Sequence, residues 1–168
     1  KMDAGDILAV RKTAILDSDN QETLRSRLSL LGRDLLIETL PKLEAGLITP
    51  IKQNDSEATY ASNVSKEMEH IKFDKTARQV FNLIRGLSPV PGAYGIINGV
   101  KVKFFESKII STNPHNPGEI VDCNKHLVIG LADGEIEVLE LQVEGKKKIK
   151  ARDFLNGQKI FHIGDIIQ

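Results

Sequence analysis

Two short stretches of this chain carry side chains that could perform chemistry or bind a charged partner. At the front, the run Met2-Asp3-Ala4-Gly5-Asp6 places two carboxylates in a tight turn before an apolar segment. Carboxylates orient groups and move protons in general acid–base catalysis, but this spacing also fits a plain turn with capping aspartates. Near the other end, residues 145–152 read Gly-Lys-Lys-Lys-Ile-Lys-Ala-Arg. Like charges this close repel one another, so the cluster fits either a solvated turn or contact with a polyanion.

Composition limits the partners that the chain can take. Its 168 residues include 23 basic and 23 acidic side chains, so any contact with nucleic acid must come from a local patch. No apolar run of about 18 residues exists, so no membrane partner is expected. The single cysteine, Cys123, cannot form an internal disulfide, which fits a cytoplasmic location. No cysteine and histidine spacing is typical of zinc, and no metal site is expected.

The first part of the chain predicts a strand and a long helix. Residues 7–16 are apolar and β-branched and read as a strand. Asp19 or Asn20 can cap a helix that follows, and Gly46 can end it. Leucines at helical spacing between these positions predict a face that packs in a core. A strand and an amphipathic helix are the tail of an α/β unit, so a chain that begins at Lys1 is expected to be a truncated or processed product.

The second part predicts a small β-barrel. A polar stretch at residues 48–65 reads as a linker, and Asp74 is expected to cap a helix over residues 75–85. The apolar period then becomes two, with strands expected at 93–97, 100–111, 118–122, 127–131 and 135–143. Asn98-Gly99 and Ala132-Asp133-Gly134 are tight hairpin turns. Five or six short strands joined by tight turns favour a small closed barrel of the OB-like kind. The phenylalanines assigned mostly to its core are Phe104, Phe105, Phe154 and Phe161.

Several motifs, in this order, resemble one family of enzymes. The turn at residues 2–6 resembles the Leu-Asp-x-Gly-Asp loop of folate-dependent formyltransferases, with Met2 in place of leucine. Residues 65–74 are similar to their Lys-Glu-Glu-x-x-Ile-Asp-Trp segment, with Phe73 in place of tryptophan, and residues 86–94 match their Pro-x-Pro-Gly-Ala turn. Residues 141–157 fit the pattern Leu-Gln-x-x-Gly-Lys-Lys-x-x-x-Ala-x-Asp-Phe-Leu-Asn-Gly, which resembles the end of methionyl-tRNA formyltransferases.

The resemblance implies a fold of class α/β plus β in three parts. Residues 1–47 would be the tail of a Rossmann-like formyltransferase domain, a strand plus a long helix. Residues 48–65 would be the linker, and residues 66–168 a C-terminal OB-like, tRNA-binding β-barrel with one leading helix. The complete enzyme would transfer a formyl group from 10-formyltetrahydrofolate to the amino group of methionyl initiator tRNA. A cytoplasmic monomer is expected.

The resemblance also implies roles for individual residues. Asp3 matches the catalytic aspartate, which works in the family with an upstream asparagine and histidine that this sequence lacks. The chain alone is therefore expected to bind no formyl donor and to be inactive. Lys66 matches a lysine near the bound tRNA, and Lys101 and Lys103 alternate on one strand. The complete set of expected tRNA-binding residues is Lys66, Lys101, Lys103, Lys146, Lys147, Lys148, Lys150 and Arg152.

Two other functions fit part of the sequence. A folate-dependent formyltransferase that acts on an amino sugar nucleotide would share the front loop and the barrel, but it would not need the lysine-rich turn. A free-standing RNA-binding OB-like module would keep the cations, but it leaves the acidic turn at Asp3 and the strand–helix unit without a purpose.

Overall fold

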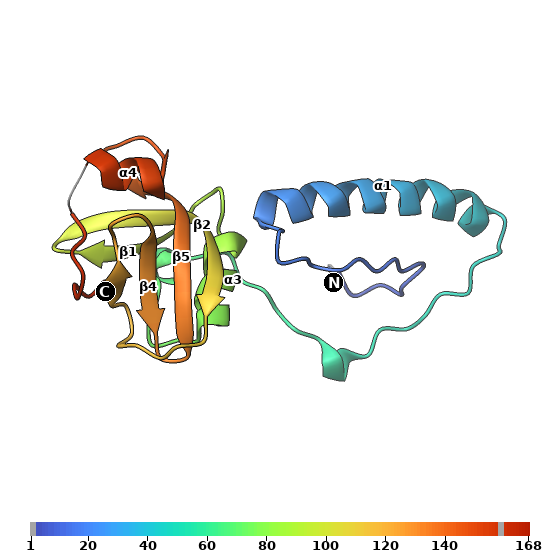
Figure 1. Cartoon of the computed structure of the whole chain (residues 1–168). Helices are drawn as coiled ribbons and strands as arrows, with labels where there is room; N and C mark the ends of the chain where they lie inside the picture. Colours follow the sequence, from blue (N-terminus) through green and yellow to red (C-terminus); the bar gives the residue numbers. More distant parts are fainter. Residues whose placement is uncertain (1–2, 158–159) are drawn as a thin grey trace. The chain divides into compact units, whose positions relative to one another are not determined.

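The computed structural model describes residues 3–157 and 160–168, which form two units, one ending at Asn63 and the other running from Val64 to Gln168 (Figure 1). The first unit contains the helix α1 (Gln21–Glu44) and a short 3₁₀ helix, η1 (Asp55–Glu57). The capping box of α1 uses Asn20, whose side chain accepts from the Thr23 amide at 2.9 Å while its amide donates to Thr23 Oγ1 at 3.0 Å.

Gly46 ends α1, as predicted. Its φ of +70° lies in the left-handed region that glycine adopts without strain. The Gly46 amide donates to the Leu43 carbonyl at 3.0 Å, and the Leu47 amide donates to the Lys42 carbonyl at 2.8 Å. These two bonds form a Schellman motif, which satisfies carbonyls that the end of the helix would otherwise leave unpaired.

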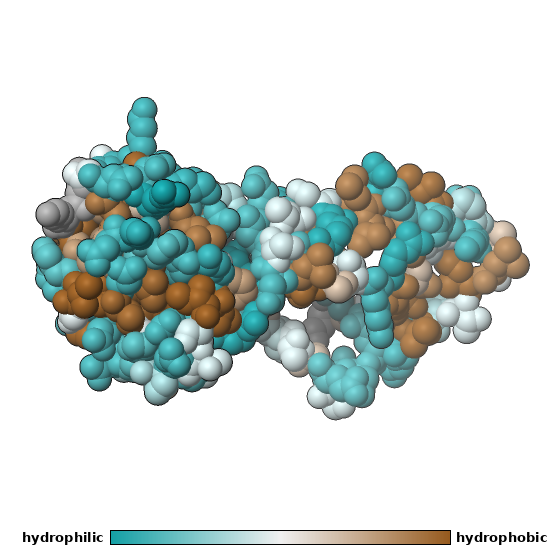
Figure 2. All heavy atoms as spheres, viewed as in Figure 1, coloured by the Kyte–Doolittle hydropathy of each residue, from teal (hydrophilic) through white to brown (hydrophobic). Residues whose placement is uncertain are grey.

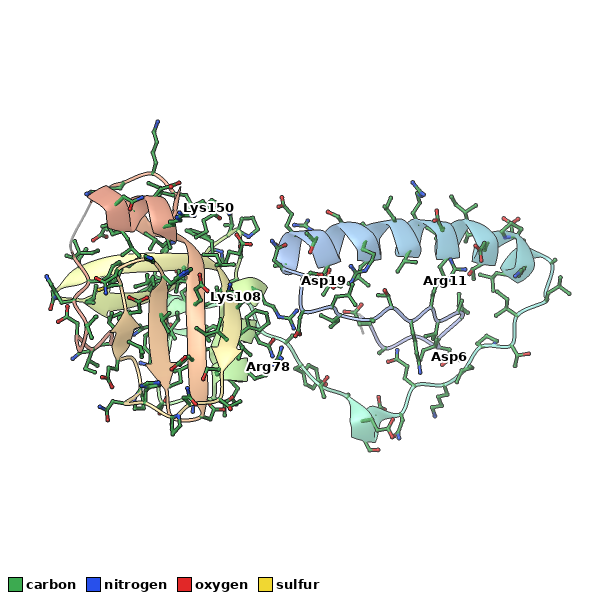
Figure 3. The ribbon with its side chains drawn as sticks, in the orientation of Figure 1. Asp6, Arg11, Asp19, Arg78, Lys108 and Lys150 are labelled. Atoms are coloured by element: carbon green, nitrogen blue, oxygen red, sulfur yellow. The ribbon has the colours of Figure 1, made fainter. Side chains whose placement is uncertain are left out.

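Asp19 holds the entry to α1 in place. Its buried carboxylate accepts from Arg27 at 2.6 and 2.7 Å and from the Leu16 amide at 2.7 Å. The hydrogen bonds from Arg27 hold the pKa of the Asp19 carboxyl well below its usual range, and the Leu16 amide adds to this effect. Figure 3 labels Asp19 at this end of the helix.

Two predictions for the first unit are wrong. Residues 8–16 form no strand, and Ile7 makes only a single antiparallel bridge, with Ile51. The predicted core face of α1 is also absent, since no residue of this helix is buried and Leu28, Leu36 and Leu40 are exposed. The reason is the same in both cases. A strand needs a partner for its backbone groups, and a leucine face needs a sheet to cover it; the described residues of this unit supply neither. Figure 2 shows apolar side chains on the surface of this unit.

The second unit begins with two helices, α2 (Lys66–Glu69) and α3 (Ala77–Gly86). Thr76, and not Asp74 as predicted, caps α3, because the Thr76 hydroxyl accepts from the Gln79 amide and the Gln79 side chain accepts from the Thr76 amide in return. The Ala77 amide also donates to Asp133 Oδ1 at 2.7 Å, which ties α3 to a hairpin turn of the sheet.

The sheet of the second unit is antiparallel throughout and curled (Figure 1). Its strands run in the order β1-β2-β5-β4-β3, and β6 pairs with the free part of β5. The strands are β1 (Ala93–Ile97), β2 (Val100–Ser111), β3 (Ile120–Asp122), β4 (Leu127–Leu131), β5 (Gly134–Val143) and β6 (Ile149–Lys150), followed by the helix α4 (Ala151–Gly157). Both hairpin turns lie where predicted, and Asn98 and Gly99 have the positive φ of a type I′ turn.

The last residues of the chain hydrogen-bond both edges of this sheet. Gln168 exchanges two backbone hydrogen bonds with Ile96 of β1, at 2.7 and 2.9 Å. On the other side, the Ile120 amide of β3 donates to the Asp165 carbonyl at 2.8 Å, and the Ile167 amide donates to the Gly118 carbonyl at 2.9 Å. The terminal segment therefore pairs with β1 on one side and β3 on the other, so neither edge is left bare.

The core lies inside the curl of the sheet and under α3. Phe104, Phe154 and Phe161 belong to it, as predicted. Phe105 is also buried but lies outside this core, because a β-bulge at this position sets it against Gly92 and Lys148. The second unit is thus a curled antiparallel sheet with a leading helix, and its architecture is consistent with the predicted OB-like class.

Candidate functional site

The front turn presents Asp3 to solvent. Asp3 has a φ of +57°, an uncommon value outside glycine, and its carbonyl accepts from the Gln53 side chain at 3.1 Å. The Gly5 carbonyl accepts from the same amide group. Among residues 3–157 and 160–168, no side chain bonds the Asp3 carboxylate. All four histidines belong to the second unit by sequence, so the first unit contains none that could be oriented by Asp3.

The cations near the end of the sheet gather at one corner, which we call the cationic corner: Lys146, Lys147, Lys148, Lys150 and Arg152. All five side chains are exposed. The connection between β5 and β6, in which Gly145 has a φ of +75°, contains Lys146, Lys147 and Lys148, while Lys150 lies on β6 and Arg152 on α4. The turn is held by the Lys146 amide, which donates to the Val143 carbonyl at 2.9 Å, and by the Gln142 side chain, which donates to the Lys146 carbonyl at 2.7 Å. The sequence prediction of one cationic cluster is therefore matched by one exposed corner.

Two cations of the corner already have acidic partners within the chain. Lys148 Nζ lies 2.8 Å from Glu140 Oε2, while Lys150 Nζ lies 2.9 Å from Glu106 Oε2 and 3.6 Å from Glu140 Oε1. The hydrogen bond that Lys150 donates to Glu106 raises the pKa of Lys150, so this lysine stays charged. Lys148 also lies over the Phe105 ring, at 5.0 Å. Figure 3 labels Lys150 beside α4.

Lys147 and Arg152 differ from these two. Neither forms an ion pair or a side-chain hydrogen bond with any other residue in the described part of the chain. Lys147 lines a hollow of about 540 Å³ together with Lys146, Lys148 and Phe154, and Arg152 lines another of about 430 Å³ with Lys150 and Glu106. An exposed cation beside a hollow can approach a phosphate without first losing an internal partner.

Lys101 and Lys103 of β2 lie on one side of the strand, as predicted, but each has an intramolecular role. Lys101 Nζ lies 3.7 Å from the centre of the Tyr94 ring, and this ring stacks on His70 at 4.8 Å between ring centres. Lys103 Nζ donates to the Pro91 carbonyl at 2.6 Å, which fixes the turn before β1. Lys66 lies on α2 and is exposed.

Sequence reasoning missed Glu106 and Glu140. They lie directly opposite each other on β2 and β5, and Lys150 on β6 lies opposite Glu140. The sequence does show acids alternating along β5, but nothing in it reveals the register that brings Glu106 to the same row. Because of the bulge at Phe105, Glu106 follows Phe104 in the ladder and faces Glu140 on the outer side.

Two negative findings concern the described residues only. No group of three or more histidine, cysteine or acidic side chains among them could hold a metal ion. No helix in the same residues has the length and apolar character needed to cross a membrane.

Comparisons with known proteins agree on one group of enzymes. Residues 63–159 match the family described as "Formyl transferase, C-terminal domain". The chain is 46% identical to a methionyl-tRNA formyltransferase of Lactobacillus gasseri, over 94% of this chain and 51% of the relative. It is 43% identical to a methionyl-tRNA formyltransferase of Lactococcus lactis subsp. lactis, over 98% of this chain and 53% of the relative. The chain thus spans about half the length of these curated relatives.

Solved structures with a similar fold are more distant in sequence. HypX from Aquifex aeolicus superposes with a TM-score of 0.66 and 20% identity, over 94% of this chain and 29% of HypX. An N-formyltransferase from Helicobacter canadensis, in complex with folinic acid and dTDP-3-aminofucose, gives a TM-score of 0.63 and 21% identity, over 82% of this chain and 51% of that protein. At this level of identity the likeness shows that the fold is shared, and it carries no information about the substrate.

Proposed function

This chain belongs to the formyl transferase family through its C-terminal domain, and on that premise we propose that it carries the C-terminal region of a methionyl-tRNA formyltransferase. The complete enzyme transfers a formyl group from 10-formyltetrahydrofolate to the amino group of methionyl initiator tRNA. Support comes from relatives of that name, which are 43–46% identical over more than nine-tenths of this chain. A role in translation implies a cytoplasmic protein, and we expect it to act as a monomer.

The domain assignment follows the same proposal. Residues 1–47 form the end of the Rossmann-like catalytic domain, residues 48–65 the linker, and residues 66–168 an OB-like barrel that binds tRNA. The hydrogen bonds from the terminal segment to β1 and β3 support the barrel part, since they link the two edges of the curled sheet. The division of the described structure near Asn63 supports a boundary at the end of the linker.

Asp3 is the carboxylate of the reaction centre in this proposal, with the role of orienting a histidine and moving a proton. Its exposed carboxylate is bonded by no described side chain, so the residues around it do not by themselves form a site for the folate donor. No step of formyl transfer is therefore assigned to the residues of this chain alone. In the complete enzyme of this proposal, an asparagine and a histidine upstream of the Asp3 loop stabilise the oxyanion.

The exposure of all five cations in the cationic corner is the observation that carries the tRNA-binding part of the proposal. Backbone phosphates dominate the affinity of RNA contacts, and exposed cations can engage them. Lys147 and Arg152 make the primary contacts, because neither has an acidic partner in the described part of the chain. The rest of the proposed tRNA-binding surface consists of Lys66, Lys101, Lys103 and Lys146, together with Lys148 and Lys150, which are already paired with acids of this chain.

A salt titration of tRNA binding tests this proposal. Fluorescence anisotropy of labelled initiator tRNA with the full chain should show an affinity that falls steeply between about 50 and 200 mM salt. Lys147→Gln and Arg152→Gln should each weaken binding and reduce the slope of log affinity against log salt by about 0.7 to 0.9. Lys42→Gln, an exposed lysine of α1, removes the same charge outside the corner and should leave the slope unchanged.

The alternatives predict different results. A formyltransferase for an amino sugar nucleotide, the kind of ligand bound in the Helicobacter canadensis structure, would bind the nucleotide and show weak or salt-insensitive tRNA binding. A free-standing RNA-binding module would bind initiator tRNA no better than an unrelated RNA hairpin. Either outcome would overturn the assignment to methionyl-tRNA.

A further inference from the structure

Resting on the proposed function, we infer that Glu106 and Glu140 hold Lys148 and Lys150 away from RNA phosphates and so limit the affinity of the cationic corner for RNA of any sequence. The register of the sheet places both acids beside the lysines of the cationic corner.

The acids and the lysines form one connected group on the outer face of the sheet. Glu106, Glu140 and Lys150 occupy one row across β2, β5 and β6. Two carboxylates directly opposite each other repel, so this row is favourable only with cations between them. Lys150 bridges the two acids, at 2.9 Å from Glu106 and 3.6 Å from Glu140, and Lys148 binds Glu140 from the turn at 2.8 Å.

A phosphate that recruits Lys150 must therefore separate it from Glu106 and leave two opposed carboxylates less well neutralised. Glu140 is the more buried of the two acids, with 21% of its side chain exposed against 51% for Glu106. Its charge is thus less screened by water and holds its partners more firmly. Contacts to phosphate carry no sequence information, so the effect of these acids is the same on every RNA.

Glu140 contacts two lysines and Glu106 contacts one, so the variants of these acids should differ in how much RNA affinity they gain. Glu140 contacts both lysines, so Glu140→Gln removes the acidic partner of Lys148 and leaves Lys150 with Glu106 alone. Glu106→Gln leaves both lysines within reach of Glu140. The double variant releases both. The expected increase in RNA affinity is therefore largest for the double variant, intermediate for Glu140→Gln and smallest for Glu106→Gln.

Glu144→Gln is the matched control. Glu144 is exposed, lies two residues from Lys146, and forms no ion pair with any described residue. Its replacement removes one negative charge from the same region without releasing a lysine. General repulsion between acids and RNA would act equally through Glu144, so any difference between Glu144→Gln and Glu140→Gln isolates the effect of the released lysine.

The experiment measures the affinity of the full chain for labelled initiator tRNA and for a mixed-sequence RNA duplex between about 50 and 200 mM salt. Each released lysine should steepen the slope of log affinity against log salt by about 0.9. The gain over wild type should therefore grow roughly threefold to fourfold from 200 to 50 mM salt where one lysine is released, and roughly twelvefold in the double variant. The gain should be the same for both RNAs, and Glu144→Gln should gain less affinity than Glu140→Gln. Thermal melting checks that each glutamine variant is folded.

The outcomes separate this inference from the proposed function. If wild type binds tRNA and Glu140→Gln and the double variant behave like Glu144→Gln, the inference is wrong and the proposed function stands. If wild type fails to bind either RNA while the double variant binds both, the inference holds and tRNA binding by the unmodified chain is wrong. If neither binds, both are overturned. A gain confined to initiator tRNA would also overturn the inference, because released phosphate contacts act on every RNA.

Discussion

Replacing Ile167 by alanine should destabilise the second unit far more than the same change at its neighbour Ile166. Only 2% of Ile167 is exposed, it belongs to the core, and its amide donates to the Gly118 carbonyl. Ile166 is 45% exposed and does not belong to that core. Each substitution removes the same three carbon atoms from adjacent positions of the terminal segment, so burial is the main difference between them.

The expected loss can be worked out from this burial. Each buried methylene contributes about 0.8 kcal/mol, so removing three carbons from Ile167 costs about 2.4 kcal/mol in transfer free energy. The cavity left behind raises the cost to about 3 kcal/mol, within the usual range for a large-to-alanine change in a core. For Ile166 the cost should stay below about 1 kcal/mol, because much of its side chain is already in water.

Hydrogen exchange read by mass spectrometry is the suitable assay, since far-UV circular dichroism would also report on α1 in the other unit. All five residues of β4 (Leu127–Leu131) are buried, so their amides report the opening of the whole sheet. Ile167→Ala should speed their exchange by roughly 100-fold, which corresponds to about 3 kcal/mol. Equal effects of the two variants, or a terminal segment that exchanges quickly while β4 stays protected in Ile167→Ala, would refute the view that this segment completes the core.

Two further predictions concern backbone and charge. Gly118→Ala should lower the free energy of unfolding of the second unit by more than about 1 kcal/mol, because Gly118 has a φ of +83° and an added Cβ would clash with the Ile167 carbonyl oxygen. Gly86→Ala, at a helical position with open space around it, should instead raise the free energy of unfolding by about 0.5 to 1 kcal/mol. Hydrogen exchange of the β4 amides measures the effect of both substitutions. Because Arg27 lowers the folded-state pKa of Asp19, this carboxylate should stabilise the start of α1 above about pH 4, with the stabilisation lost as pH falls through the folded value. Exchange of the Leu16 amide between about pH 6 and pH 2 should show that loss in wild type and not in Asp19→Asn; an identical pH dependence in both would contradict it.

Positions whose backbone conformation is set by adjacent residues could be predicted from the sequence. Gly46 after α1 and Asn98-Gly99 between β1 and β2 both adopt positive φ, which few other residues tolerate. Such signals depend only on neighbouring residues, and they fixed the end of a helix and the register of a hairpin. The choice of Thr76 over Asp74 as a cap was missed because both residue types can cap a helix, and here the reciprocal bond to Gln79 decides between them.

Predictions that need a distant partner were less successful. The apolar pattern of residues 7–16 indicates strand propensity, but a strand forms only where another strand pairs with its backbone. In the described residues, Ile7 forms a single bridge with Ile51. The terminal segment shows the opposite case. Residues 160–168 carry no strand period in the sequence, yet their backbone pairs with both β1 and β3. In both cases the result depends on which edges the fold leaves available.

The cationic corner depends both on residues that are neighbours in the sequence and on partners that are distant in it. The cations themselves are adjacent in sequence and were identified from it, whereas their acidic partners come from β2 and from β5. The bulge that brings Glu106 beside Lys150 cannot be recognised in the sequence, because it lies at two consecutive phenylalanines, Phe104 and Phe105. An apolar residue is compatible with either face of this sheet, since the outer side is partly covered. Without the extra residue Glu106 would slip by one position in the ladder and point to the other face, away from Lys150. A count of charges would then overlook that Lys148 and Lys150 face carboxylates, and that a bulge in β2 gives Lys150 its second acidic partner, Glu106.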